Sequence, residues 1–388
     1  MKPELIDIRH DLHANPELLY AVERTADKVA GILRTTGVDE VITNFGRTGV
    51  LGILHGRNGP ADRAEKRVLF RADMDALPIA EATNLPYSSK SPGLMHACGH
   101  DGHTTMLLGA ARHLAATRNF DGVAHLIFQP AEEGGAGAQV MIDDGLFERF
   151  PCDSVFAMHN WPGLPPGTIA VKPGPMMAAA DRVTITVEGR GGHGAHAYLA
   201  VDPVVVAAHI VTAAQTIVSR NVSPIDSAVV SLCSIEAGNP GAMSVIPREA
   251  RIVGTVRTFR RDTQNLVEEN LRRLCESVAA GFGARAQGQY ERVYPATINT
   301  RDEALFGQMV AEELVGAHNV IRDLDPSMGA EDFAFMLQQR PGAYFRIGQG
   351  TGESGCFLHD TRYDFNDGIL PLGAALFVRL VEHALPLP

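Results

Sequence analysis

The sequence has little positive charge, no long hydrophobic run and few cysteines. Its 388 residues include 34 lysines and arginines against 45 aspartates and glutamates, which gives a formal net charge of -11. This balance, without any basic stripe, argues against nucleic acid or an anionic membrane as the main partner. No apolar run reaches the 18 residues of a membrane-spanning helix, and the start of the chain lacks the apolar core of a signal peptide. We therefore expect a cytoplasmic protein.

The cysteines are five, an odd number, and none of them shows C-x-x-C spacing. A disulfide framework is not expected in a reducing compartment. Cys152, Cys233 and Cys275 lie in apolar segments and are predicted to be small core residues. Cys98 differs from them because of its neighbours.

The segment 96–103, with the sequence HACGHDGH, gathers a thiol, three imidazoles and a carboxylate. Soft sulfur together with imidazole nitrogen is a ligand set for transition metals. The segment precedes an apolar helix expected over residues 104–116, for which Asp101 is the predicted N-cap. A lone cysteine or histidine is more often an ordinary loop or core residue, but the density of this segment favours metal binding.

Polar residues follow the ends of successive buried strands in the first part of the chain. Asp75, the pair Glu132 and Glu133, and His159 each come after such a strand. In α/β sheets the carboxyl edge of the strands is where ligands bind, so we expect these residues to lie together. The strands concerned are expected over residues 68–72, 123–128 and 154–158.

The pattern changes near residue 181, where apolar and polar residues begin to alternate as in a half-exposed strand. From there the elements follow the order β-α-β-β-α-β, which is the split ferredoxin-like order. We expect strands over 181–188, 227–235, 251–259 and 284–290, and helices over 203–218 and 263–280. The predicted organisation is an α/β domain in two parts, residues 1–180 and 294–388, interrupted by an α+β domain over residues 181–293.

Glu132 and Glu133 are adjacent, so on an extended backbone their side chains point in opposite directions. One can then bind a metal while the other accepts a proton from an attacking water. The alternative for a Glu-Glu pair is a solvated surface turn. His159 and His359 are single histidines, and a buried core histidine remains the alternative for each of them.

A glycine-rich segment, residues 189–196, follows the first strand of the inserted domain and contains His193. Its glycines would let the backbone approach a ligand closely. A phosphate-binding loop is disfavoured because the Gly-Lys-Ser/Thr signature is missing and the preceding strand is not a buried parallel one.

Seven motifs, taken together and in this order, resemble those of the metal-dependent amidohydrolases of the hippurate hydrolase and aminoacylase family, within the zinc-exopeptidase superfamily. The similarity extends from about residue 6 to residue 382. The motifs are RADMDALP at 71–78, HACGHDGHT at 96–104, QPAEEGG at 129–135, GGHGA at 191–195, GTVR at 254–257, GAEDF at 329–333 and YDFND at 363–367.

The resemblance implies two adjacent divalent metal ions in each subunit. Zinc is expected first, because sulfur and imidazole favour it, with manganese, cobalt or nickel as alternatives. The thiolate of Cys98 would be able to bridge the two ions. The implied ligands are Cys98, His100, Glu133, His159 and His359.

The resemblance also implies roles around the metals. Glu132 matches the general acid/base, and Asp75 matches an acidic residue that orients the metal site. His193 matches a lid histidine that polarises the scissile carbonyl and reaches across a dimer interface in related enzymes. Arg257 matches an arginine that holds the substrate carboxylate, a task suited to a bidentate guanidinium. Ser244 replaces the family's usual asparagine near the expected substrate pocket.

The implied fold is a zinc-exopeptidase-like α/β domain, with a mixed central sheet flanked by helices, and an inserted ferredoxin-like dimerisation lid. The implied reaction is hydrolysis of the amide bond of N-acyl amino acids, such as hippurate, by a homodimer or dimer-based oligomer. A dipeptidase or carboxypeptidase using the same site is the alternative. A non-catalytic binding homologue would lack a ligand or the base, and none is lacking. The acyl group, the amino acid and the stereochemistry stay open.

Overall fold

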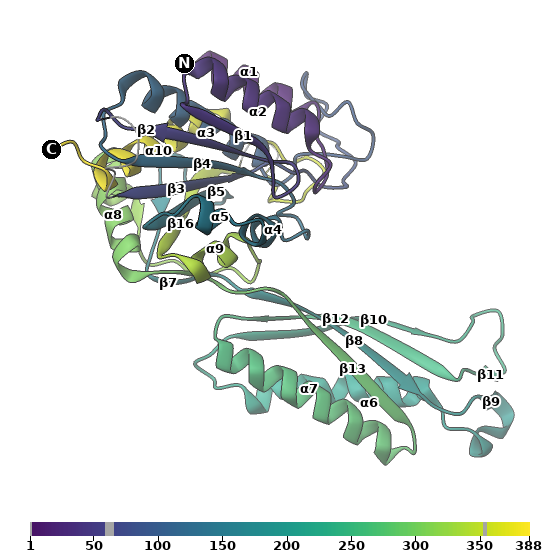
Figure 1. Cartoon of the computed structure of the whole chain (residues 1–388). Helices are drawn as coiled ribbons and strands as arrows, with labels where there is room; N and C mark the ends of the chain where they lie inside the picture. Colours follow the sequence, from purple (N-terminus) through teal and green to yellow (C-terminus); the bar gives the residue numbers. More distant parts are fainter. Residues whose placement is uncertain (1, 59–65, 352–354) are drawn as a thin grey trace. The chain divides into compact units, whose positions relative to one another are not determined.

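The computed structural model describes residues 2–58, 66–351 and 355–388, and the chain divides into two compact units (Figure 1). Unit 1 comprises Met1–Met176, Ile298–Asp325 and Asp332–Pro388, and unit 2 comprises Met177–Thr297 and Pro326–Glu331. The insertion expected from the sequence lies within unit 2. The short segment Pro326–Glu331, which the sequence pattern places in the α/β domain, also belongs to unit 2.

Unit 1 is built on an eight-stranded mixed sheet in the order β1-β2-β4-β3-β5-β16-β6-β15. The neighbours β4, β3, β5 and β16 run parallel, so their carboxyl ends meet at one edge of the sheet. The strands are β1 (Glu40–Phe45), β2 (Gly49–His55), β3 (Arg67–Asp73), β4 (Val123–Gln129), β5 (Ser154–Pro162), β6 (Ile169–Ala170), β15 (Val320–Ile321) and β16 (Gly342–Gly350).

Helices cover this sheet, and all seven residues of β4 are buried as a result. One group of helices, α1, α2, α3 and α10, packs together, while α4 and α9 pack together against β4 and β5 (Figure 1). The mixed α/β class expected from the sequence is thereby confirmed. The helices are α1 (Lys2–His13), α2 (Glu23–Thr36), α3 (His100–Thr117), α4 (Gly137–Asp143), α5 (Leu146–Arg149), α8 (Arg301–Val315), α9 (Phe333–Gln339) and α10 (Leu370–Ala384).

Two local predictions in unit 1 are wrong. Helix α3 begins at His100 rather than at residue 104, and its N-cap is Gly99 with a φ of 92°, so Asp101 lies in the first turn instead of capping the helix. Strand β5 continues to Pro162, so His159 lies inside the strand and not beyond its end. The strands β1 and β2 were not predicted at all.

Unit 2 contains a four-stranded antiparallel sheet in the order β10-β12-β8-β13. The elements follow the order β-α-β-β-α-β, and the helices α6 and α7 pack on each other and on the sheet (Figure 1). They are β8 (Ala179–Glu188), α6 (Pro203–Thr216), β10 (Ala228–Ala237), β12 (Glu249–Thr258), α7 (Arg261–Gly281) and β13 (Arg285–Tyr294). A separate two-stranded ladder pairs β9 (Gly192–His193) with β11 (Val245–Ile246).

Unit 2 has an exposed cysteine and a long apolar helical segment that is only partly buried. Cys233, predicted in the core, is exposed because it lies at an irregularity of the edge strand β10, between Leu232 and Ser234. The segment Pro203–Asn221 is long and apolar enough to cross a membrane by length and composition alone, and 33% of its apolar 18-residue window is buried. Such a single segment is weak evidence for a membrane span, since core helices of other proteins have the same length and composition.

Candidate metal centre

Seven of the predicted site residues lie at the carboxyl edge of the parallel strands of unit 1. Asp75 follows β3, the two glutamates follow β4, and His159 lies in β5. Cys98 and His100 lie at the start of α3, whose first residues face the same edge. His359 arrives from the segment before α10, where its backbone N–H donates to the carbonyl of Ala97 at 2.8 Å.

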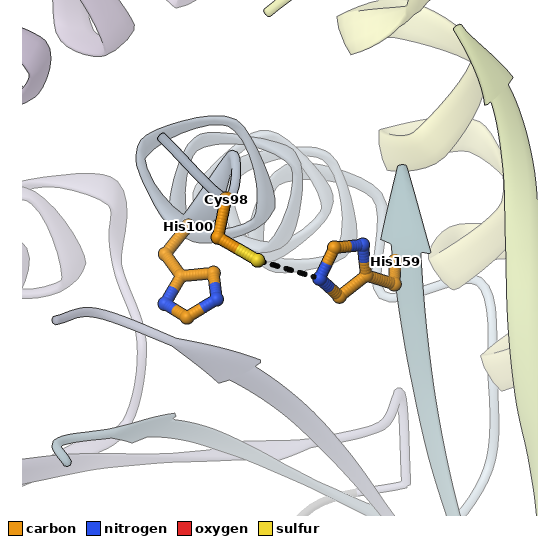
Figure 2. Close-up of side chains that lie close together, drawn as sticks. All are labelled: Cys98, His100 and His159. Atoms are coloured by element: carbon orange, nitrogen blue, oxygen red, sulfur yellow. Dashed lines mark hydrogen bonds between the residues drawn. The ribbon is translucent and has the colours of Figure 1, made fainter. Parts of the chain in front are cut away.

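Two groups of possible metal ligands share the thiol of Cys98. In the first group Cys98 is joined by His100 and His159, and in the second by Glu133 and His359. Within each group the ligand atoms lie within 4.8 Å of one another. Figure 2 shows the thiol between the two imidazoles of the first group, with Sγ at 3.3 Å from Nε2 of His159. A thiolate in this position could contact two ions at once.

The electrostatics of His100 indicate a site for a cation. Its ring nitrogens lie 3.6 Å from Asp75, 3.8 Å from Asp73 and 3.9 Å from Glu133, yet neither has a hydrogen-bond partner among the described residues. Burial lowers the pKa of His100, but the surrounding carboxylates outweigh it and raise the pKa to about 10. The buried carboxylates around this imidazole favour a positive charge at its position. A bound metal ion would supply that charge in place of the proton.

The other candidate ligands are tuned by the same surroundings. Burial and the carboxylates of Glu133 and Glu132 raise the pKa of Cys98 well above its usual value. Burial and His103 hold the pKa of His159 well below its usual value, so this imidazole stays neutral. Its Nδ1 lies 2.6 Å from the carbonyl oxygen of Asn160 and donates to it, which leaves the lone pair of Nε2 for a metal.

The second group is held together by a close contact between His359 and Glu133. Nε2 of His359 lies 3.2 Å from Oε1 of Glu133. Burial raises the pKa of Glu133, but His359 and His100 outweigh it and lower that pKa. The glutamate is thus kept as a carboxylate, the form that binds a divalent ion.

Asp75 fixes the pair of glutamates through their backbone. Its two carboxylate oxygens accept the N–H groups of Glu132 at 2.9 Å and Glu133 at 3.1 Å. The segment is a turn, entered through Ala131 with a φ of 57°, so the extended backbone predicted for this pair is wrong. The turn nevertheless leaves both side chains at the site, since His100, Glu132 and Glu133 form a further group within 4.8 Å.

Of the other two histidines in the 96–103 segment, His103 makes hydrogen bonds to residues that surround the candidate ligands. Its Nδ1 lies 2.6 Å from Asp73 and its Nε2 lies 2.7 Å from the side-chain oxygen of Asn160, so both nitrogens are engaged. His96 is buried, and burial lowers its pKa to about 3. Neither histidine belongs to the two groups that share Cys98.

A buried network around Arg71 was missed in the sequence, although its members lie in three of the quoted motifs. The guanidinium of Arg71 donates to Asp73 at 2.7 Å, to Gln129 at 2.8 Å and to Asp332 at 2.8 Å. Asp332 also accepts from the side-chain amide of Gln129 and from the backbone N–H of Ala138. The signal available in the sequence was an arginine inside an otherwise apolar strand, since a buried arginine requires acidic partners.

The three remaining predicted residues lie in unit 2. His193 is exposed in β9, and its neighbour Gly194 donates to the carbonyl of Ser244 at 2.7 Å, so these two predicted residues are adjacent. Arg257 lies in β12, and burial lowers its pKa. In unit 2, then, the expected lid histidine lies beside Ser244, and Arg257 lies in the four-stranded sheet.

The fold and the site define a class of protein. Buried sulfur, imidazole and carboxylate ligands at the carboxyl edge of a parallel sheet, with a further glutamate beside them, are typical of a metal-dependent hydrolase. The donor set suits divalent transition ions, since thiol, imidazole and carboxylate groups converge here and both ring nitrogens of His100 lack a hydrogen-bond partner among the described residues.

Comparison with known proteins identifies the family. Residues 69–383 match the pattern of peptidase family M20/M25/M40, and the chain belongs to this family. It is 42% identical over 385 residues to hippurate hydrolase of Campylobacter jejuni, covering 97% of each chain. It is 37% identical to an N-acetylcysteine deacetylase of Bacillus subtilis, covering 98% of this chain and 97% of that one. The family resemblance and the expected hydrolase class are thus confirmed.

A solved structure agrees with this assignment. A dinuclear metal-binding peptidase of the M20 family from Bacillus subtilis superposes with a TM-score of 0.84 at 33% identity, covering 99% of this chain and 98% of that chain. The likeness extends over both units rather than over the α/β unit alone.

Proposed function

We propose that this protein hydrolyses the amide bond of N-acyl amino acids, of the N-benzoyl or N-acetyl type, to a carboxylic acid and a free amino acid. The observation that carries the proposal is the shared thiol of Cys98, which joins two ligand groups beside Glu132. The similarity to a hippurate hydrolase and to an N-acetylcysteine deacetylase supports the substrate class.

Two divalent metal ions would be held by the residues of the two groups, with zinc expected and manganese, cobalt or nickel as alternatives. The ions would lower the pKa of a water molecule and polarise the scissile carbonyl. The residues assigned to them are Cys98, His100, Glu133, His159 and His359.

Glu132 is the proposed general base. It takes a proton from the attacking water and later returns that proton to the leaving amine, so one carboxylate serves both halves of the reaction. Its side chain is buried beside the ligands, and Asp75 fixes its backbone. Asp75 is therefore proposed as a positioning residue rather than as a proton carrier.

His193, Arg257 and Ser244 are the proposed contributions of unit 2. The backbone N–H of Ala195 donates to Nδ1 of His193 at 3.1 Å, so the proton of the neutral ring lies on Nε2. That N–H can donate to a carbonyl oxygen as negative charge develops on it, a contribution of about 3–4 kcal/mol for one such donor. Arg257 would bind the carboxylate of the amino acid, with Ser244 at the edge of the pocket.

Unit 2 is proposed to be a ferredoxin-like dimerisation lid inserted in the zinc-exopeptidase-like fold. The edge strand β10 and the helix α6 carry exposed apolar side chains, including Ile235, Val204 and Val205. An open strand edge beside an apolar helix face suits pairing with a second copy of the chain. We therefore propose a homodimer, located in the cytoplasm, with a small-molecule substrate.

Turnover of matched substrates by the metal-reconstituted enzyme tests this function. Benzoyl-glycine and N-acetyl amino acids should be hydrolysed faster than free dipeptides and C-terminally extended peptides. Preference for the peptides would instead support the dipeptidase or carboxypeptidase alternative. Glu132→Gln should keep its fold and metal content but lose activity by at least about 100-fold. Near-normal turnover in this variant would show that Glu132 is not the base.

A further inference from the structure

Asn160 follows the candidate ligand His159 in β5 and is completely buried. Its backbone carbonyl accepts from Nδ1 of His159 at 2.6 Å, which leaves Nε2 of that ring facing the thiol of Cys98 (Figure 2). A hydrogen bond of this kind fixes both the tautomer and the ring orientation of a metal-binding histidine. The main chain of Asn160 therefore determines which nitrogen of His159 faces a metal.

The side chain of Asn160 packs on the loop that carries the other two ligands of this group. Gly99 lies between Cys98 and His100 and has a φ of 92°. A Cβ atom at position 99 would lie only 2.3 Å from Oδ1 of Asn160, so the amide rests directly on this backbone. The same Oδ1 lies 2.7 Å from Nε2 of His103 in α3. One side chain thus contacts both the loop and the helix start that present these ligands.

The same side-chain amide also reaches the segment that carries His359. Its Nδ2 donates to the hydroxyl of Tyr363 at 2.7 Å and to Oε1 of Gln349 at 2.7 Å. The orientation of Gln349 is set independently, since its own Nε2 donates to the carbonyl of Asp364 at 3.1 Å. The backbone N–H of Tyr363 donates to the carbonyl of Asp360, the residue after His359, at 3.0 Å. The amide therefore connects the two ligand groups.

These hydrogen bonds lie in the interior of unit 1. His103, Tyr363 and Gln349 are each no more than 2% exposed. In such surroundings a fully paired polar network is rigid, and a polar group that loses its partner costs more than it would at the surface. The network can therefore hold the ligands in place before a metal binds, which reduces the entropy lost on binding.

We propose that Asn160 is a positioning residue that sets the geometry, and hence the metal affinity, of both ligand groups. The inference rests on the metal centre of the proposed function. Asn160 acts on the first group through its carbonyl and through its packing on Gly99. It acts on the second group through Tyr363, so loss of this hydroxyl alone should affect mainly the group that contains His359.

Titration of the apoprotein with Co²⁺ tests this role, because bound cobalt reports its ligands through its absorption spectrum. Asn160→Ala should weaken the tighter of the two affinities by about 10- to 100-fold and shift the thiolate-to-cobalt absorption band. The looser affinity should fall as well. Tyr363→Phe, which removes only the hydroxyl, should weaken the looser affinity by about tenfold and leave the tighter one nearly unchanged.

Asn299→Ala is the matched control. Asn299 is also a buried asparagine of unit 1, but its side chain makes its hydrogen bonds to the backbone of Lys172 and Tyr344. Thermal unfolding of the apoproteins should show a loss of stability in both alanine variants. Metal affinity and the cobalt spectrum should change only in Asn160→Ala, which separates a change in ligand geometry from a general loss of stability.

Two results would overturn the proposal. The first is a wild-type cobalt spectrum with wild-type affinities in Asn160→Ala. The second is an equal loss of affinity in Asn160→Ala and Asn299→Ala, which would reduce the effect to stability. If Asn160→Ala does not fold, Tyr363→Phe decides alone, and unchanged affinities in that variant would also overturn the proposal. A wild type that binds no metal would instead refute the proposed function.

Discussion

Neutralising Asp332 should destabilise the buried network around Arg71 without removing a candidate metal ligand. Its Oδ1 accepts from Arg71 at 2.8 Å and from the side-chain amide of Gln129 at 2.9 Å. Its Oδ2 accepts from the same amide at 2.8 Å and from the N–H of Ala138 at 2.9 Å. In Asp332→Asn one of these oxygens becomes an NH2 group that faces donors only, and the buried guanidinium of Arg71 loses one of its carboxylate partners.

The magnitude follows from burial. Breaking a buried ion pair by neutralising one partner costs about 3–5 kcal/mol, because the other charge remains in the interior. Asp73 still pairs with Arg71 at 2.7 Å, which places the expected cost near the lower end, about 3 kcal/mol. At roughly 2–4 °C per kcal/mol for a unit of this size, the melting temperature should fall by about 6–12 °C. Activity should fall too, since Gln129 leads into the turn that carries Glu132.

Thermal unfolding followed by circular dichroism measures this change. The control is Asp39→Asn, the same substitution in an ion pair with Arg118 whose side chains are 35% and 26% exposed. Partly solvated pairs contribute about 0–1 kcal/mol, so the control should shift the melting temperature by no more than about 4 °C. Equal shifts in the two variants would refute the reasoning that burial of the Arg71 network holds this part of the fold.

Three further predictions concern the metals, the pH dependence and the substrate. Titration of the apoprotein with a divalent metal should show two affinities, and Cys98→Ala should weaken both; a variant that loses only one site would show that the thiol does not bridge. Burial lowers the pKa of His13, but Asp101 and Glu81 outweigh it and raise the pKa to about 9. Because this value lies above the unfolded one near 6.5, the stabilisation is complete below pH 6.5 and is lost as the pH rises through 9. His13→Gln should therefore flatten the free energy of unfolding between these pH values, and an unaltered slope would contradict it. Arg257→Ala should raise KM for benzoyl-glycine by about tenfold to a hundredfold but leave KM for its carboxamide nearly unchanged; equal effects on both would exclude recognition of the carboxylate.

The sequence predicted the elements with strong periodicity and failed where tertiary contacts decide. The buried strands β3, β4 and β5 were recognisable as apolar runs, each followed by polar residues. In contrast, β6 and β15 are two residues long and only extend the sheet beyond β16, so the sequence carries no periodic signal for them. The antiparallel pair of β1 and β2 was also not predicted from the sequence.

The candidate ligands could be predicted as residue types, but the contacts that support them could not. Asp73 and Asn160 gain their roles only because β3 and β5 are neighbours in the sheet, which brings both to His103. Spacing along the chain does not contain that information. The helix start was wrong for a related reason, since the N-cap is Gly99 at a positive φ, and Asp101, the expected N-cap, lies in the first turn.

The two ligand groups differ in rigidity, and this difference explains why two metal affinities are expected. Cys98, His100 and His159 are all buried and are carried by α3, its N-terminal loop and β5. In the other group His359 is 51% exposed, lies outside regular structure and has a φ of 65°. A ligand on a solvated segment loses more conformational freedom when it binds a metal, and its competing interaction with water is stronger. The buried group should therefore fill first, and the group that contains His359 should fill at higher metal concentration.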